Sequence, residues 1–414
     1  MSQLIRNVKV VDPNSSFGGK NVDLLLVAGR VEEIREAGNI HSQSASAIEE
    51  KGLCVAPGWV DVMADYCDPG YEHKESVESG LAAAAAGGFT DVFVVPNTQP
   101  VIGNKAAVEY LASRAKGNKA NLYALGAVSK LAEGKELAEM LDMRAAGAVA
   151  FSDGWHPVQN AGLLLKALEY VKAFDGVIIQ LPILSSLANG GLMNESETSV
   201  RLGMSGIPAI AESLLVQRDI ELVRYTGSKI HFSGISTEAS LNLVRAAKAD
   251  GLQVTCSVTP YHLLFTEENL QQYDSLYKVA PPLRNEQERL NLVAALADGT
   301  IDCIATHHRP QDWDAKVKEF EYAQYGMAMQ EVCFAALLQA APDVTLERWV
   351  ALLSTNARKI FNLEKISLEQ GAAISNFTFF SPETVWVPGV GVKQTKAYNL
   401  PFMGQPLKGK AFVL

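Results

Sequence analysis

Residues 55–70 read VAPGWVDVMADYCDPG, and this stretch decides the fold of the chain. A short apolar run leads into a polar cluster that ends in Pro-Gly, and the segment AAAAAGGFTDVFVVPNT follows further along the chain. An apolar run of this length, bounded by turn residues, is typical of a strand that is buried on both faces. The pattern predicts a strand, a helix and a second strand, with polar side chains where each strand ends.

The same alternation continues over the middle of the chain. Eight apolar, β-rich runs occur there, most of them followed by a helix-length segment with apolar residues at three- and four-residue steps. The runs are APGWVDVMA, DVFVVPN, ANLYALGAVS, GAVAFSD, GVIIQLP, KIHFSGIS, QVTCSVTPY and IDCIATHH. Eight such repeats predict a parallel (β/α)8 TIM barrel. A doubly wound open sheet is the structural alternative, but no GxGxxG opens a helix after a strand, so dinucleotide binding has no support.

The two ends of the chain have a different pattern. Short alternating runs of apolar and polar residues, such as LIRNVKVVD and ISNFTFFS, are separated there by turn residues. Such runs are typical of small antiparallel strands. We therefore expect residues 1–52 plus 364–414 to form one small β-sandwich domain, and residues 53–363 to form the barrel domain.

Composition excludes several classes of function. The formal net charge is −10, and no basic block alternates with aromatic residues, so neither nucleic acid nor membrane is an expected partner. The longest apolar runs are too short to cross a bilayer, and the first residues have no apolar signal core. The five cysteines lack CxxC spacing and mostly lie in apolar runs, as reduced packing residues of a cytoplasmic protein do.

A (β/α)8 barrel builds its active site from side chains at the carboxyl ends of its strands. The predicted strand ends supply Met63, Asp65, Cys67, Asn97, Asp153, Leu181, His231, Gly234, Tyr261, His262, His307 and His308. Period-two alternation puts His231 and Gly234 on opposite faces of one strand, which predicts that His231 is a core histidine. Asp61, inside the first run, is expected to be structural.

The ordered motifs resemble those of the dihydroorotases, a family of cyclic amidohydrolases, over essentially the whole chain. Matching signatures are AAAAAGGFTDVFVVPNTQPV, GAVAFSDG, NGGLMNESETSVRLGMSGIPAIAES, HFSGIST, VTCSVTPYHL, KVAPPLR and GTIDCIATHH. The resemblance implies an amidohydrolase-type barrel in which one or two zinc ions activate a hydroxide and a strand-8 aspartate moves the proton. The reaction that it implies is the reversible ring closure of carbamoyl aspartate.

Most positions that the resemblance assigns to metal binding and proton transfer are replaced in this chain. Met63 and Asp65 stand at the positions of the two strand-1 ligands. Leu181 stands at the position of the strand-5 ligand, Gly234 at that of the strand-6 ligand and His307 at that of the proton-transfer residue. Leucine, glycine and thioether methionine cannot replace imidazole on zinc. We therefore predict no metal cofactor. The alternative left open is a reduced single-metal site made from Asp65, Asp153, His307 and His308.

The substrate-binding positions are altered as well. The carboxylate-binding arginine of the family corresponds to Cys67, and the asparagine of Lys-Val-Asn-Pro-Pro-Leu-Arg corresponds to Ala280. The strand-8 motif Asp-His-Ala-Pro-His ends here in Gln311. Only Asn97 and Asp153 stand unaltered among the core positions.

Two bulky residues, Trp155 and His156, follow Asp153 where the family usually has a second aspartate. We expect them to fill the emptied pocket. Arg309 takes the place of the alanine in the strand-8 motif, at the expected barrel mouth.

These replacements predict a dihydroorotase-like protein of pyrimidine biosynthesis that is catalytically impaired or inactive and serves as a structural or regulatory subunit. A homodimer and a complex with aspartate transcarbamoylase are the expected assemblies. The alternative is an active, divergent cyclic-amide hydrolase, similar to dihydroorotase, hydantoinase or allantoinase, with a single metal. A third hypothesis is a small-molecule sensor in which Arg309 binds an anion.

Overall fold

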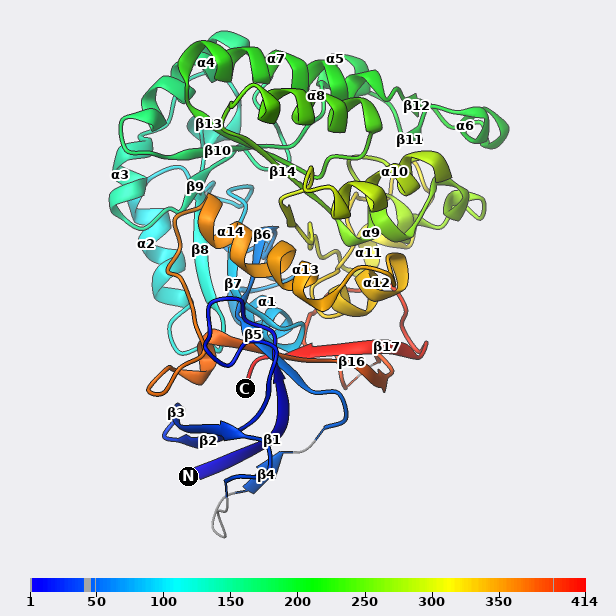
Figure 1. Ribbon diagram of the computed structural model, residues 1–414. Coiled ribbons are helices and arrows are strands. Elements are labelled where there is room, and N and C mark those ends of the chain that lie inside the picture. Colours follow the sequence, from blue (N-terminus) through cyan, green and yellow to red (C-terminus); the bar gives the residue numbers. More distant parts are fainter. Residues whose placement is uncertain (1, 41–45, 49, 390) are drawn as a thin grey trace.

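The computed structural model describes residues 2–40, 46–48, 50–389 and 391–414. Figure 1 shows strands surrounded by helices and, below them, a sheet built from the first and last segments of the chain. Both termini lie in this lower part.

Eight parallel strands form the barrel, in the order β15-β14-β13-β10-β9-β8-β7-β6. Their bounds are β6 Trp59–Ala64, β7 Phe89–Val94, β8 Asn121–Gly126, β9 Ala150–Phe151, β10 Val177–Gln180, β13 Lys229–Ser233, β14 Val254–Val258 and β15 Cys303–Ile304. All residues of β6 and β7 are buried, as strands between a filled interior and a helical layer must be. Each strand overlaps one of the eight predicted runs, and β7 begins two residues before its run, so the (β/α)8 TIM barrel is confirmed and the open sheet is wrong.

Asp61 joins the first strand of the barrel to the last. Its carboxylate accepts hydrogen bonds from the Thr306 N–H at 2.9 Å, from the Thr306 hydroxyl, and from Gln330 Nε2 at 2.8 Å. A parallel bridge between Ala64 and His308 completes the ring. Burial raises the pKa of Asp61, and the hydrogen bonds from Thr306 oppose that shift. The structural role expected for Asp61 is confirmed.

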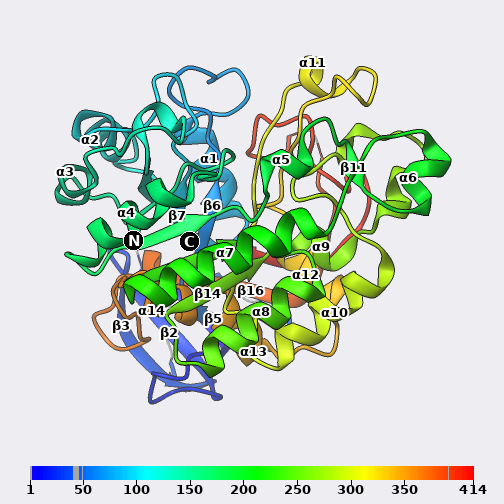
Figure 2. The same ribbon diagram turned by 90° about the horizontal axis from the view of Figure 1, so that it is seen from above.

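Helices cover the outside of the strands; α7, α8 and α10 are seen there in Figure 2. The main ones are α1 Val77–Ala86, α2 Lys105–Arg114, α3 Met140–Ala145, α4 Ala161–Lys172, α7 Ile210–Thr226, α8 Glu238–Ala249, α10 Glu286–Ala297, α12 Cys333–Ala340, α13 Leu346–Val350 and α14 Asn356–Ile360. Side chains of Ser76, Asn104 and Asn160 cap the first turns of α1, α2 and α4. In the described part of the chain, none of the helices combines the length and apolar character needed to span a bilayer.

Both chain ends contribute to one sheet with the order β17-β16-β5-β1-β2-β3, and β4 pairs beside β1. Its strands are β1 Ser2–Val10, β2 Asn21–Val27, β3 Arg30–Glu36, β4 Ser46–Ile48, β5 Cys54–Pro57, β16 Phe377–Trp386 and β17 Leu407–Phe412. The expectation that both chain ends form β-structure together is confirmed by this sheet. Strand β5 pairs with β1 and β16 immediately before the chain enters the barrel at β6, so the sheet fixes where the barrel starts.

Replacement of Asp61 by asparagine tests the closure of the barrel. The Asp61→Asn amide would face the N–H donors of Thr306 and Gln330 with an N–H2 group, so we expect a loss of about 2 kcal/mol of stability. Asp175→Asn is the matched control, because this exposed carboxylate pairs with Lys229 at the surface and should contribute little. Thermal denaturation compares the two variants, and equal losses would contradict the role of Asp61.

Candidate functional site

The end of β6 places an acid among apolar neighbours. Met63 is buried in a cluster that also contains Leu181 and Trp155. The Asp65 carboxylate accepts a hydrogen bond from Trp155 Nε1 at 2.8 Å and another from the Cys67 N–H at 2.9 Å. Both oxygens of Asp65 are thus engaged by protein donors.

Cys67, at the position of the family's carboxylate-binding arginine, is buried. Burial raises the pKa of its thiol well above the ordinary value, and the charge of Asp65 adds to the shift. The thiol is therefore protonated near neutral pH and is a poor nucleophile.

The loop after β9 is fixed by Asn97 and Asp153. Asn97 Nδ2 donates to the Asp153 carbonyl at 3.0 Å, and its Oδ1 accepts from the Trp155 N–H at 2.9 Å. The Asp153 carboxylate accepts hydrogen bonds from the N–H and the hydroxyl of Ser129. Burial raises the pKa of Asp153 to about 6. These two unaltered residues therefore hold the loop that carries Trp155.

His307 occupies the space beside Gly234. A Cβ atom added at Gly234 would lie 2.5 Å from His307 Cε1. The imidazole packs edge-on against Trp155, with ring centroids 5.5 Å apart, and also against Tyr261. Burial lowers the pKa of His307 well below the ordinary value, so the ring is neutral.

A chain of hydrogen bonds runs from His307 down the interior of the barrel. His307 Nε2 lies 2.8 Å from Ser233 Oγ, which lies 3.2 Å from Ser257 Oγ. Ser257 Oγ is 3.1 Å from His231 Nε2, and His231 Nδ1 is 2.9 Å from Thr255 Oγ1. Burial lowers the pKa of His231 to about 3. The prediction that His231 is a core histidine is confirmed.

The next two strand-8 candidates point elsewhere. His308 Nδ1 accepts a hydrogen bond from the Met329 N–H at 3.2 Å, and its Nε2 lies 3.6 Å from Glu75. Gln311 accepts a hydrogen bond from Lys74 Nζ at 2.9 Å. His308 therefore contacts a different part of the protein from His307, and the backbone turns between them because His307, beyond the end of β15, has a left-handed φ of +46°.

The four residues of the alternative metal set do not converge, since each contacts a different part of the protein. Their respective partners, for Asp65, Asp153, His307 and His308, are Trp155, Ser129, Ser233 and Glu75. Over residues 2–40, 46–48, 50–389 and 391–414, no three His, Cys, Asp or Glu side chains are grouped in a way that could hold a metal. The zinc that the fold family implies is not matched by the donors present at these positions.

A cavity of about 280 Å³ remains at the barrel mouth. Trp155, His156, Leu181, Ala280 and Arg309 contribute to its lining. Trp155 is buried and fills the mouth as expected, whereas His156 is exposed and lies in the cavity wall. The Arg309 guanidinium carbon lies 4.5 Å from the centre of the Trp155 ring, within the range of a cation–π contact.

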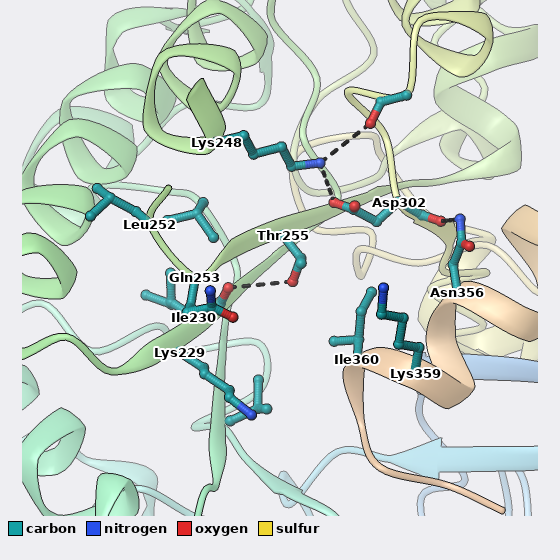
Figure 3. Close-up of a pocket in the computed structure, with 13 residues that line it drawn as sticks. Lys229, Ile230, Lys248, Leu252, Gln253, Thr255, Asp302, Asn356, Lys359 and Ile360 are labelled. Atoms are coloured by element: carbon teal, nitrogen blue, oxygen red, sulfur yellow. Dashed lines mark hydrogen bonds and ion pairs between the residues drawn. The ribbon is translucent and has the colours of Figure 1, made fainter. Parts of the chain in front are cut away.

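A second cavity, of about 490 Å³, lies at the opposite end of the strands (Figure 3). Its lining includes Lys229 and Val254, which are the first residues of β13 and β14. Lys248 donates hydrogen bonds to the Asp302 carboxylate at 2.7 Å and to the Thr300 carbonyl at 2.8 Å. Barrel active sites form at the carboxyl ends of the strands, so we assign no catalytic role to this cavity.

Comparison with known proteins identifies the family. A family model described as Dihydro-orotase-like matches residues 52–240. A dihydroorotase of Syntrophus aciditrophicus (strain SB) is 38% identical over 416 residues, which cover 100% of this chain and 97% of that protein. The chain belongs to the dihydroorotase family. A dihydroorotase of Acetivibrio thermocellus is also 38% identical to this dihydroorotase-family chain. The alignment covers 99% of this chain and 96% of the Acetivibrio protein.

Solved structures support the same architecture. An L-hydantoinase (dihydropyrimidinase) from Arthrobacter aurescens superimposes with a TM-score of 0.83 at 22% identity, covering 99% of this chain and 94% of that one. A dihydropyrimidinase from Brevibacillus agri NCHU1002 gives a TM-score of 0.80 at 18% identity, covering 100% and 94%. These likenesses show the fold that the dihydroorotase-family chain shares with the hydantoinases.

Sequence reasoning did not identify the serines of the site. Ser233 stands two residues after His231, and Ser257 two residues after Thr255, so each pair projects to the same side of its strand. This period-two spacing within two apolar runs was the available signal. Ser129, the partner of Asp153, lies in a loop where no periodicity marks it.

Replacement of Gly234 by alanine tests the contact with His307. The backbone φ of +83° is unfavourable for alanine, and the new Cβ would collide with the imidazole. In a His307→Ala background only the backbone strain remains, about 1–2 kcal/mol, so the loss from Gly234→Ala should be smaller there. Thermal denaturation of the four proteins in this double-mutant cycle measures the coupling; strictly additive losses would contradict the contact.

Proposed function

We propose that this dihydroorotase-family chain serves pyrimidine biosynthesis as a catalytically impaired subunit with a structural or regulatory role. The observation that carries the proposal is the packing of the barrel mouth. There the Trp155 indole N–H donates to Asp65, and the Trp155 ring packs against the His307 ring. Activation of a hydroxide in this family needs zinc ligands at the strand ends. Here the same positions bear side chains that bond to other protein groups or are apolar.

Two of the titratable side chains that the structure describes at the strand ends, His307 and Asp153, are already engaged by protein groups. His307 is neutral, but its Nε2 lies 2.8 Å from Ser233 Oγ and its Nδ1 lies 3.4 Å from the Tyr261 hydroxyl. Asp153 is occupied by Ser129. A general base must be within hydrogen-bond reach of the proton that it takes, so these groups favour an impaired site.

The scaffold, in contrast, has residues whose replacement would disrupt its packing or hydrogen bonding. A Cβ atom at Gly58 would lie 2.0 Å from Thr90 Oγ1, so only glycine fits where the terminal sheet meets the barrel. Asp61 likewise keeps its full set of hydrogen bonds. Retention of fold-critical residues beside loss of the ligand positions supports a role that needs the folded surface rather than the reaction.

Metal content and turnover test the proposal together. We expect the purified protein to hold far less than one zinc ion per chain and to show no ring closure of carbamoyl aspartate, with or without added zinc or manganese. The dihydroorotase of Syntrophus aciditrophicus is a suitable control in the same assays, because it spans the whole chain. Stoichiometric zinc with turnover would overturn the proposal, while activity on hydantoins or allantoin would favour the divergent hydrolase.

We also infer that the partner is aspartate transcarbamoylase and that the chain forms a homodimer. Mixing the purified chain with aspartate transcarbamoylase from the same organism should give a shared peak in size-exclusion chromatography and a change in transcarbamoylase activity. Light scattering of the chain alone should give twice the mass of one chain. Separate elution at micromolar concentrations, with unchanged transcarbamoylase activity, would contradict this assembly.

A further inference from the structure

The cavity at the barrel mouth has a single cationic group whose hydrogen-bond donors are unused. Among the described residues, the Arg309 guanidinium forms no hydrogen bond or ion pair, and its contact is with the face of Trp155. The backbone of Arg309 is fixed on both sides, since its N–H donates to the Met327 carbonyl at 3.1 Å and its carbonyl accepts from Asn399 Nδ2 at 3.0 Å. A stacked guanidinium on a rigid backbone presents its planar edge in one direction.

The neighbouring acids do not satisfy this arginine. Asp65 is close enough to raise the pKa of Arg309 against the lowering effect of burial, but its oxygens are held by Trp155 Nε1 and the Cys67 N–H. Glu133, at the rim of the cavity, pairs with Lys135 at 3.0 Å. The charge of the guanidinium therefore remains available to a molecule that enters the cavity.

The rest of the lining defines the shape and polarity of that molecule. Leu181, Ile183 and Pro157 form apolar walls beside the Trp155 ring. Partial desolvation in the cavity wall and the charge of Arg309 both lower the pKa of His156, which favours a neutral imidazole with a polar nitrogen over a second charge. One guanidinium and a cavity volume of about 280 Å³ suit a small molecule with a planar ring and one carboxylate group. A phosphate dianion would require more hydrogen-bond donors than one guanidinium supplies.

We propose that this cavity binds a small organic carboxylate, with Arg309 making a bidentate contact and the apolar walls holding a flat ring. Arg309 stands where the family's strand-8 motif has alanine, and Cys67 stands where the family's strand-1 motif has the carboxylate-binding arginine. The anion contact is thereby assigned to strand 8 instead of strand 1. This inference goes beyond the proposed function and does not depend on whether the chain is active.

Three pairs of probes test the proposal by thermal shift and calorimetry on the full chain. Each pair compares a flat carboxylate with a neutral counterpart: benzoate with benzamide, nicotinate with nicotinamide, and orotate with uracil. We expect at least one carboxylate to stabilise the protein while its neutral counterpart does not. Only the carboxylate can accept two charge-assisted hydrogen bonds from the guanidinium. Inorganic phosphate should bind more weakly than that carboxylate.

Variants then assign the contact to one residue. Arg309→Gln should weaken the best carboxylate by about tenfold or more, and Arg309→Lys should restore only part of it. Arg224→Gln is the matched control, because this exposed arginine pairs with Asp250 at the surface and should leave binding unchanged. The melting temperatures of the ligand-free variants establish that each is folded.

Three results would overturn the proposal. The first is equal binding of carboxylates and their neutral counterparts. The second is binding that Arg309→Gln leaves unchanged, which would place the anion elsewhere on the surface. The third is the absence of any shift with all three carboxylates at roughly 10 mM, a concentration that would detect even millimolar affinity. Whether the same preparations catalyse ring closure of carbamoyl aspartate tests the proposed function, and it does not test whether this cavity binds a carboxylate.

Discussion

The closure of the barrel between its first and last strands is the constraint on which the rest of the structure depends. Asp61 accepts hydrogen bonds from Thr306, and the Asp65 N–H donates to the His308 carbonyl at 2.8 Å. Because residues on both sides of it are anchored to β6, His307 adopts a left-handed φ of +46° and directs its ring into the barrel. A non-glycine residue in this region carries strain of about 1 kcal/mol or more, which the flanking contacts must offset. The same closure sets the position of Arg309, two residues further along the chain.

The interior beneath His307 shows how a barrel stays well packed when its strand ends present no metal ligands. Buried polar groups are costly unless they are hydrogen-bonded, and a void of several atoms would lose packing energy. The chain of hydroxyls and imidazoles from His307 to Thr255 satisfies the first requirement. The Trp155 ring, set between His307 and Arg309, satisfies the second. The side chains at the mouth thus form one packed unit, and a change in one of them alters the surroundings of the others.

Periodicity explains which parts of this arrangement the sequence could predict. The eight strands, the core position of His231 and the structural role of Asp61 follow from apolar runs and alternation within them. The divergence of His307 and His308 could not be predicted in this way, because both lie beyond the end of β15 and the left-handed φ of His307 breaks the alternation. The hydrogen bonds from Trp155 to Asp65 and from Ser129 to Asp153 could not be predicted, because they join loops whose paths have no sequence period. The stacking of Arg309 on Trp155 depends on two such loops at once.

The charges at the mouth connect these loop contacts to one another. Asp65 and Asp153 are both buried, and neither has a cationic side chain bonded to it. Burial raises the pKa of Asp153 to about 6, and the hydrogen bonds from Ser129 oppose only part of that shift. Asp65 instead shares Trp155 with Arg309: the indole N–H faces the carboxylate, and the ring face lies against the guanidinium. A tryptophan in this position links an acid to a base without letting them pair directly. It therefore offsets the buried charge of Asp65 while the hydrogen-bond donors of Arg309 stay directed to the cavity.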